Sequence, residues 1–150
     1  MQTEGSTLAL LRRLVFALVV IGLGGLALDL LLLGHHEDAW QVAPLISLGV
    51  GLVVCGWHGV KGTAASLRGL QLAMVLLALT GLVGMGLHFN GNREFQLEMD
   101  PSQSGWRLFL KVIQAHSPPA LAPAAFVQFA LLGLVYSFRH PALLTRPSAS

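Results

Sequence analysis

The sequence predicts an all-α integral membrane protein: a four-helix transmembrane bundle, both termini cytoplasmic, with a short interfacial helix in the outer loop between the third and fourth helices. Hydrophobic residues make up 54% of the 150 residues and charged residues only 11%, which is too apolar for a soluble domain of this length. Four apolar stretches are also long enough to cross a hydrocarbon core of about 30 Å as helices. We expect one transmembrane domain, residues 1–150.

The first apolar stretch covers about residues 14–34 and follows Arg12 and Arg13. A cleaved signal peptide is a second interpretation, because paired arginines before an apolar run also open signal sequences. The stretch is too long for that, and no A-x-A cleavage motif follows it. The second stretch, about residues 43–60, has Pro44 in its first turn, where a missing amide hydrogen is tolerated.

The third stretch covers about residues 69–89 and is expected to end at the turn-forming cluster of residues 90–92. The fourth covers about residues 119–138. Three prolines crowd its start: Pro118, Pro119 and Pro123. They predict an irregular first turn, whose backbone groups need partners from neighbouring segments or water.

Basic residues orient the bundle, because cytoplasmic loops carry an excess of Lys and Arg. Six fall on the side of the termini: Arg12, Arg13, Lys61, Arg68, Arg139 and Arg146. Three fall on the other side: Arg93, Arg107 and Lys111. We therefore expect a multi-pass protein of the bacterial plasma (inner) membrane. The net charge is only +2 and no basic stripe is present, so no nucleic-acid partner is expected.

The outer loop, residues 90–118, carries two patterns. Apolar and polar residues alternate over residues 94–100, which predicts a strand-like segment that lies on the bundle or adds to the sheet edge of a partner. After Pro101, apolar residues recur at helical spacing: Trp106, Phe109, Leu110 and Ile113. This second pattern predicts a short helix in the membrane interface or over the mouth of the bundle.

Small residues predict where the helices pack, because helix association in lipid depends on close backbone approach. In the second stretch they recur every four positions: Ser47, Gly51, Cys55 and Gly59. Gly22 and Gly25 are candidates in the first stretch, and Gly81 and Gly84 in the third. Cys55 is the single cysteine, so no internal disulfide is possible.

Asp29 lies about five residues below the outer end of the first stretch, where a charge in lipid is costly. We expect this buried acid to point into the bundle, either protonated or paired with His88, His36 or Arg93. One structural hydrogen bond is its simplest role, and proton or ion handling is the alternative.

The outer face gathers nitrogen and oxygen donors suited to transition metals: His35, His36, Glu37, Asp38, His88, Glu94 and His116. The candidate metal ligands are His36, His88, Glu37 and His35, although no spacing matches a metal motif and outer loops are polar because water is there. A b-type haem would use His88 with His35 or His36. His58 is expected at the inner interface beside Trp57. The cofactor, if any, is unknown.

No catalytic motif is present: there is no nucleophile elbow, P-loop or dinucleotide fingerprint. The sequence is more typical of a non-enzyme. The favoured interpretation is a non-catalytic accessory or assembly module that binds other membrane proteins, or copies of itself, within the lipid bilayer. The alternative is a metal-, proton- or haem-binding membrane protein that uses the outer cluster of Asp29 and histidines.

Overall fold

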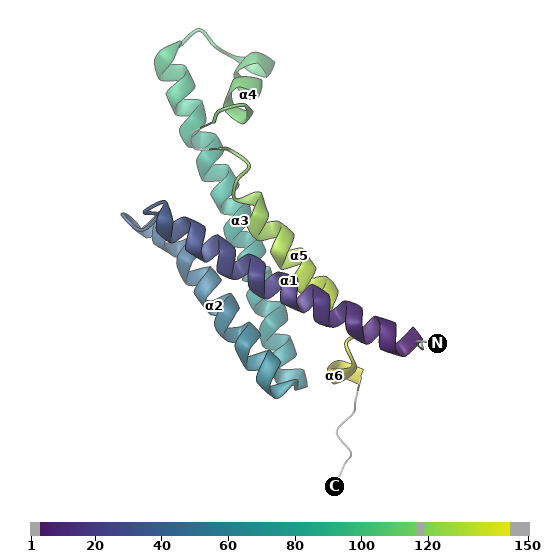
Figure 1. Cartoon of the computed structure of the whole chain (residues 1–150). Helices are drawn as coiled ribbons and strands as arrows, with labels where there is room; N and C mark the ends of the chain where they lie inside the picture. The colour runs from purple at the N-terminus through teal and green to yellow at the C-terminus, as the bar shows by residue number, and fades with distance from the viewer. Residues whose placement is uncertain (1–3, 117–118, 145–150) are drawn as a thin grey trace.

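The computed structural model describes residues 4–116 and 119–144. These residues form six helices and no strand (Figure 1): α1 (Glu4–Leu32), α2 (Ala39–Lys61), α3 (Ala64–Met99), α4 (Gly105–Ile113), α5 (Ala124–Ser137) and α6 (Pro141–Leu144). The predicted all-α class is confirmed. α1, α2 and α3 are long and apolar enough to cross a membrane, which supports the predicted membrane class. Ser117, Pro118 and Arg146 lie outside the described residues.

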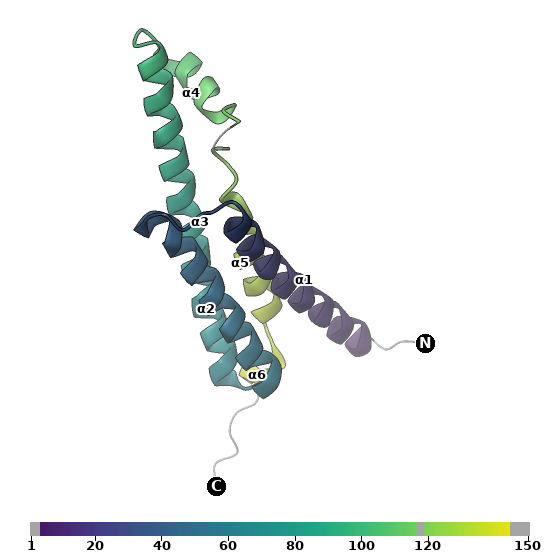
Figure 2. The same ribbon diagram turned by 60° about the vertical axis from the view of Figure 1, so that its left-hand side comes forward.

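Four of the helices, α1, α2, α3 and α5, pack around one core. α3 packs against α2 and α5, and α1 packs against the same two helices, so α1 and α3 lie diagonally opposite each other. Figures 1 and 2 show α1 inclined to α2 and α3, with its N-terminal end away from the other helices. All four helices contribute buried side chains to the core, which include Val19, Leu23, Leu48, Leu70, Met74, Leu77, Phe126 and Ala130.

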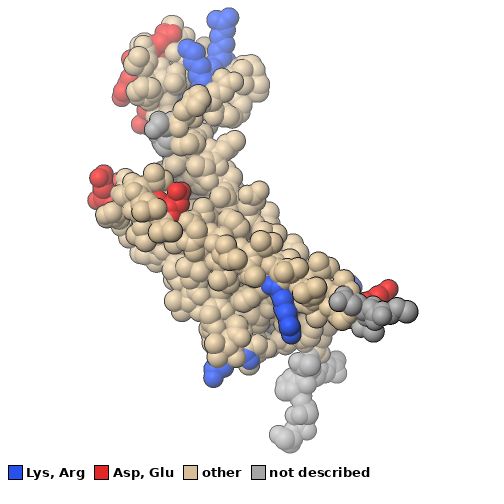
Figure 3. Space-filling view, in the orientation of Figure 1, with Lys and Arg blue, Asp and Glu red and all other residues tan. Residues whose placement is uncertain are grey.

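The outward faces of these helices are apolar. Large hydrophobic side chains are exposed along α1, α2 and α3, among them Leu18, Ile21, Val53, Leu72 and Leu79. In Figure 3 a band without charged side chains separates Lys and Arg near the lower end from acidic residues above it. Such a surface is solvated by hydrocarbon rather than by water, which is why the helices need little burial within the chain.

The connection from α1 to α2 is determined by local sequence. Gly34 adopts a left-handed conformation with φ of 66°, which a glycine tolerates best. Beyond it the N–H of His35 donates to the carbonyl oxygen of Leu30 at 2.9 Å, as in the Schellman ending of a helix. The carboxylate of Asp38 then caps α2 by accepting from the N–H of Gln41 at 2.9 Å.

The end of the third helix differs from the prediction. α3 continues through residues 90–92 to Met99, so the strand that the alternation over residues 94–100 predicts is wrong. A helix pairs each amide within the segment, whereas an isolated strand has no partner. α4 also packs against this part of α3, and the rings of Phe89 and Phe109 lie 6.0 Å apart.

The predicted short helix is present as α4. Among the described helices α4 packs only against α3, so it does not cover the mouth of the bundle. Figures 1 and 2 show that α4 and the end of α3 project beyond the α1–α2 connection. We call α4 together with residues 89–99 the outer head, and the end of the bundle beside it the outer end.

The fourth helix is shorter than predicted. α5 has 14 residues, a length of about 21 Å at 1.5 Å per residue. Residues 119–123 form turns instead of helix, because proline lacks the amide hydrogen that a helix interior needs. Pro123 occupies the N-cap position of α5. The prolines therefore delay the start of the helix rather than bend it.

Candidate functional site

An open cavity of about 710 Å³ lies at the outer end, between α1, α2, α3 and the turns before α5. Most of its wall is apolar, and the polar residues that line it are Asp29, His35, Gln41, Thr80, His88 and Asn92. This volume falls within the range of sites that hold small molecules, roughly 300–1,000 Å³. Three of the predicted outer-face residues, Asp29, His35 and His88, share this cavity.

Asp29 occupies the last turn of α1, and its exposed side chain lines the cavity. Its carboxylate forms no hydrogen bond or ion pair with residues 4–116 or 119–144. The predicted pairing with His88, His36 or Arg93 is therefore not formed, and the acid does not tie the helix ends together. The cavity thus holds an acid that has no partner in the part of the chain that the structure describes.

His88 has a structural role that the sequence did not reveal. Its Nδ1 lies 3.0 Å from the carbonyl oxygen of Pro119. Because a carbonyl oxygen only accepts, Nδ1 carries a proton, and in the neutral form of such a ring Nε2 keeps an unshared electron pair. This bond connects α3 to the turn before α5 and gives a backbone carbonyl of that irregular segment a partner.

The other predicted metal ligands are dispersed. His36 and Glu37 are exposed and do not line the cavity, and Asp38 is used as the cap of α2. Within the described ranges, no three His, Cys, Asp or Glu side chains come together as a metal site. The predicted set of His35, His36, Glu37 and His88 is not assembled as one ligand group here.

A second polar cluster lies at the end of the bundle opposite the cavity, which we call the inner end. His58, expected at the inner interface beside Trp57, belongs to this cluster. The side chain of His58 is only 3% exposed. Its Nδ1 lies 2.9 Å from the hydroxyl oxygen of Ser66, and its Nε2 lies 2.8 Å from the hydroxyl oxygen of Tyr136. The ring of Phe16 covers the cluster, with its centroid 5.9 Å from that of His58.

The hydrogens of this inner cluster form one consistent chain. The hydroxyl of Ser66 donates to the carbonyl oxygen of Thr63 at 2.9 Å, so it accepts from Nδ1–H of His58. Nε2 then accepts from the hydroxyl of Tyr136. Every polar atom of the imidazole is paired without a charge, which is what a buried histidine needs.

Helical spacing contained a signal for this burial. Residues seven apart are nearly in register on a helix of 3.6 residues per turn, whereas residues eight apart are rotated by about 80°. His58 lies seven positions after Gly51 and is buried, whereas Gly59 lies eight positions after Gly51 and is exposed. The buried side of α2 therefore passes from Gly51 to His58, while a Cβ at Gly59 would still meet the ring of Phe16 at 3.7 Å.

The predicted packing glycines divide into two groups. The ring of Phe129 lies directly over Gly22. A Cβ at Gly81 would come within 2.8 Å of the Pro123 carbonyl oxygen, and one at Gly84 within 3.0 Å of the Pro123 side chain. Gly25 faces open space within 4 Å, so it makes no close helix contact in this chain.

Two close glycine contacts were missed by the sequence reasoning. The side chain of Met74 lies against Gly133, and the ring of Trp57 lies 2.8 Å from the position of a Cβ at Gly69. Gly133 is the single glycine of the fourth stretch, and Gly69 lies twelve positions before the next glycine of the third, Gly81, so spacing gave no signal for either. Cys55 and Gly51 are buried as expected for a packing face, and Ser47 is half-buried.

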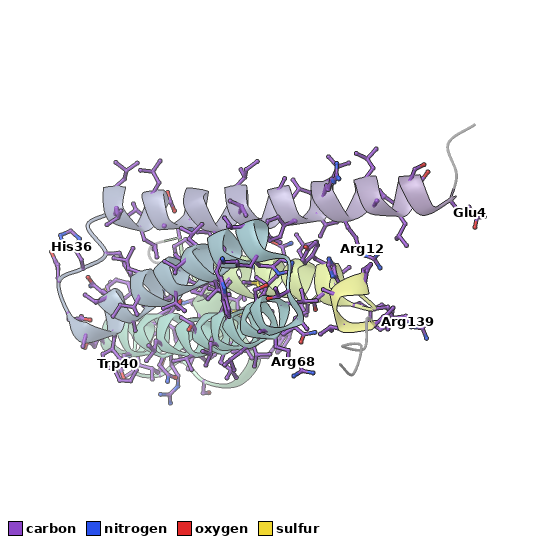
Figure 4. The ribbon with its side chains drawn as sticks, turned by 90° about the horizontal axis from the view of Figure 1, so that it is seen from below. Glu4, Arg12, His36, Trp40, Arg68 and Arg139 are labelled. Carbon is purple, nitrogen blue, oxygen red and sulfur yellow. The ribbon has the colours of Figure 1, made fainter. Side chains whose placement is uncertain are left out.

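Some of the basic residues lie at the end opposite the cavity, whereas the outer head contains Arg93, Arg107 and Lys111. Figure 4 shows Arg12, Arg68 and Arg139 toward one end of the molecule and His36 and Trp40 at the other. The guanidinium of Arg12 donates to the carbonyl oxygen of Arg139 at 3.1 Å. Arg139 has a left-handed φ of 46°, which turns the chain sharply after α5.

Comparison with known proteins gave no match among protein families, curated proteins or solved structures.

Proposed function

We propose that this chain crosses the bacterial plasma (inner) membrane four times, with both termini in the cytoplasm. The segment that contains α5 makes the fourth crossing together with the turns at residues 119–123. Irregular backbone at membrane depth is tolerated where it packs against protein, and these turns contact His88 and Gly84 of α3. Basic residues near the inner end support the orientation, since cytoplasmic ends are enriched in Lys and Arg.

Site-specific labelling tests this topology. In a Cys55→Ala background, Ser104→Cys at the N-cap of α4 is expected to react with a membrane-impermeant thiol reagent in intact cells. Lys61→Cys, at the end of α2, is expected to react only after permeabilisation. Both positions are exposed, so accessibility within the protein does not bias the comparison. The reverse pattern, or equal labelling of both, contradicts the proposed orientation.

The activity proposed for the chain is that of a non-catalytic accessory or assembly module, which binds another membrane protein or a second copy of itself through the outer head. The observation that supports it is the apolar surface of the head. Trp106 is 69% exposed, Met99 71% and Phe95 57%. Exposed apolar surface beyond the bundle is typical of interaction sites, and Trp and Met are enriched in them.

The aromatic rings of the head are already ordered. Trp106 stacks on Phe109 with centroids 4.9 Å apart, and Val112 of the same helix is fully buried. Side chains held in place before binding lose less conformational freedom when a partner docks. This arrangement favours binding over a purely solvating role for the head.

Photo-crosslinking in cells tests the module. A photoreactive residue at Trp106 is expected to give one discrete protein adduct, whereas the same residue at Ile21, which is equally exposed on α1, is expected to give none. An adduct of twice the 16.0 kDa mass identifies a second copy as the partner. If neither position gives a protein adduct, the proposal is contradicted.

A separate measurement tests the competing activity. Protein purified in mild detergent is expected to contain no stoichiometric transition metal and to show no Soret band. Either signal would favour a metal or haem protein over an accessory module. The two measurements are independent, because the outer head and the cavity share few residues.

A further inference from the structure

The unpartnered carboxylate of Asp29 indicates what the outer cavity binds. No Lys or Arg among the described residues lines the cavity, so this part of the chain supplies no basic counter-charge there. Asp29 lies at the C-terminal end of α1, which carries partial negative charge and favours cations. No basic residue occupies the last turn of that helix. The site is therefore complementary to a positively charged group that comes from outside the described chain.

The neighbouring histidines refine the nature of this cation. His88 donates through Nδ1 to Pro119, and a neutral imidazole that donates in this way has an acceptor at Nε2. Together with the carboxylate of Asp29, the cavity offers acceptors to a group that has several N–H donors, such as a primary ammonium. His35 also lines the cavity, and a neutral imidazole has one N–H that can donate to a phosphate oxygen.

The cavity continues into an apolar groove along the bundle. A second hollow of about 490 Å³ lies between α2 and α3 and shares Trp40, Thr80 and Leu87 with the first. Its wall extends from Leu87 to Ala73 on α3, roughly 21 Å along the helix. Ser47 is one of its few polar residues, and its hydroxyl already donates to Pro44. The groove therefore fits a hydrocarbon chain.

Trp40 lies where the two hollows meet and is 67% exposed. Tryptophan is enriched at the level of lipid headgroups, because its ring is apolar and its N–H is polar. Acceptors for an ammonium lie on one side of it, and an apolar groove lies on the other. This order, from headgroup to chain, is that of a phospholipid.

We infer that the outer cavity and the α2–α3 groove bind a phospholipid with a primary ammonium headgroup, phosphatidylethanolamine, with its ammonium on Asp29. Phosphatidylcholine has a quaternary nitrogen without N–H donors, and phosphatidylglycerol has no cation. If the three lipids have identical acyl chains, the apolar groove contributes equally to the binding of each. Selectivity among them therefore depends on the headgroup amine.

Native mass spectrometry of the detergent-purified chain tests this inference with the three lipids carrying identical acyl chains. Phosphatidylethanolamine is expected to bind about tenfold more tightly than phosphatidylglycerol, the change typical of one charge-assisted hydrogen bond. Asp29→Asn is expected to abolish this preference. Glu37→Gln removes a nearby exposed acid outside the cavity and is expected to retain it.

A second variant tests the groove. Ala43 lines only the apolar hollow and is exposed. Ala43→Trp is therefore expected to weaken the binding of all three lipids by the same factor and to leave the order of their affinities unchanged. Equal binding of the three lipids to the unaltered protein overturns the inference, even if Asp29→Asn fails to fold. A preference that survives in folded Asp29→Asn overturns it as well.

Discussion

Nε2 of His58 lies 2.8 Å from the hydroxyl oxygen of Tyr136, although 78 positions separate them in the sequence. His58 belongs to α2 and Tyr136 to α5, and these two helices do not pack directly against each other. The bond therefore crosses the interior of the bundle diagonally. It connects helices that share no backbone contact.

Tyr136→Phe is expected to lower the free energy of unfolding by about 1–3 kcal/mol, because it leaves a buried acceptor on His58 unpaired. Chemical denaturation in mild detergent measures the change. In a His58→Leu background, Tyr136→Phe is expected to lower the free energy of unfolding much less. Equal costs in both backgrounds would show that the bond contributes nothing to stability.

Paired glycine substitutions in α3 test the helix contacts. Gly81→Ala is expected to destabilise the protein by about 1–3 kcal/mol, because a Cβ there would lie 2.8 Å from backbone and side-chain atoms before and within α5. Gly86→Ala is the matched control, since a Cβ there meets nothing within 4 Å. It is expected to be neutral or to stabilise by up to about 1 kcal/mol. Similar losses from both would contradict the packing.

Gly91→Ala tests the continuity of α3. In an uninterrupted helix with open space around it, alanine is expected to stabilise the protein by up to about 1 kcal/mol. In the turn that residues 90–92 suggested, the same change would destabilise a left-handed glycine. Thermal unfolding together with hydrogen exchange of residues 90–99 distinguishes the two. Rapid exchange of these amides would contradict the helix.

Acidification is expected to weaken the inner end through His140. Burial lowers the pKa of His140 below its ordinary value of 6.5, and the nearby His58 and Arg12 lower it further. Its Nδ1 accepts from the N–H of Ala142 at 3.2 Å, which protonation would break. Since the folded chain holds this proton less tightly than the unfolded chain, the stabilisation is complete above about pH 6.5 and is lost as the pH falls through the lowered pKa.

Denaturation at a series of pH values below neutrality measures this effect. His140→Asn retains an acceptor for the Ala142 amide but does not titrate, so its stability is expected to fall less on acidification. Parallel curves for the two proteins would exclude His140 as the source of the dependence.

The candidate site was predicted only in part. The sequence identified Asp29 because a charged residue within an apolar stretch is energetically costly. In the structure, Asp29 lines the outer cavity together with His35 and His88. Spacing did not predict that His88 binds the Pro119 carbonyl, because the two residues lie 31 positions apart. It also did not distinguish Gly22, which lies under Phe129, from Gly25, which meets open space. Periodicity identifies a face of a helix but not the neighbour that covers it.

The sequence by itself determined that the chain is helical and that α1, α2 and α3 are long and apolar, because composition and hydrophobic period depend only on residues close together along the chain. The tertiary structure decided where α3 ends and that His58 is buried inside the bundle. Each of these depends on partners that approach from distant segments, and their contacts outweigh the weaker local preferences for turns and interfaces.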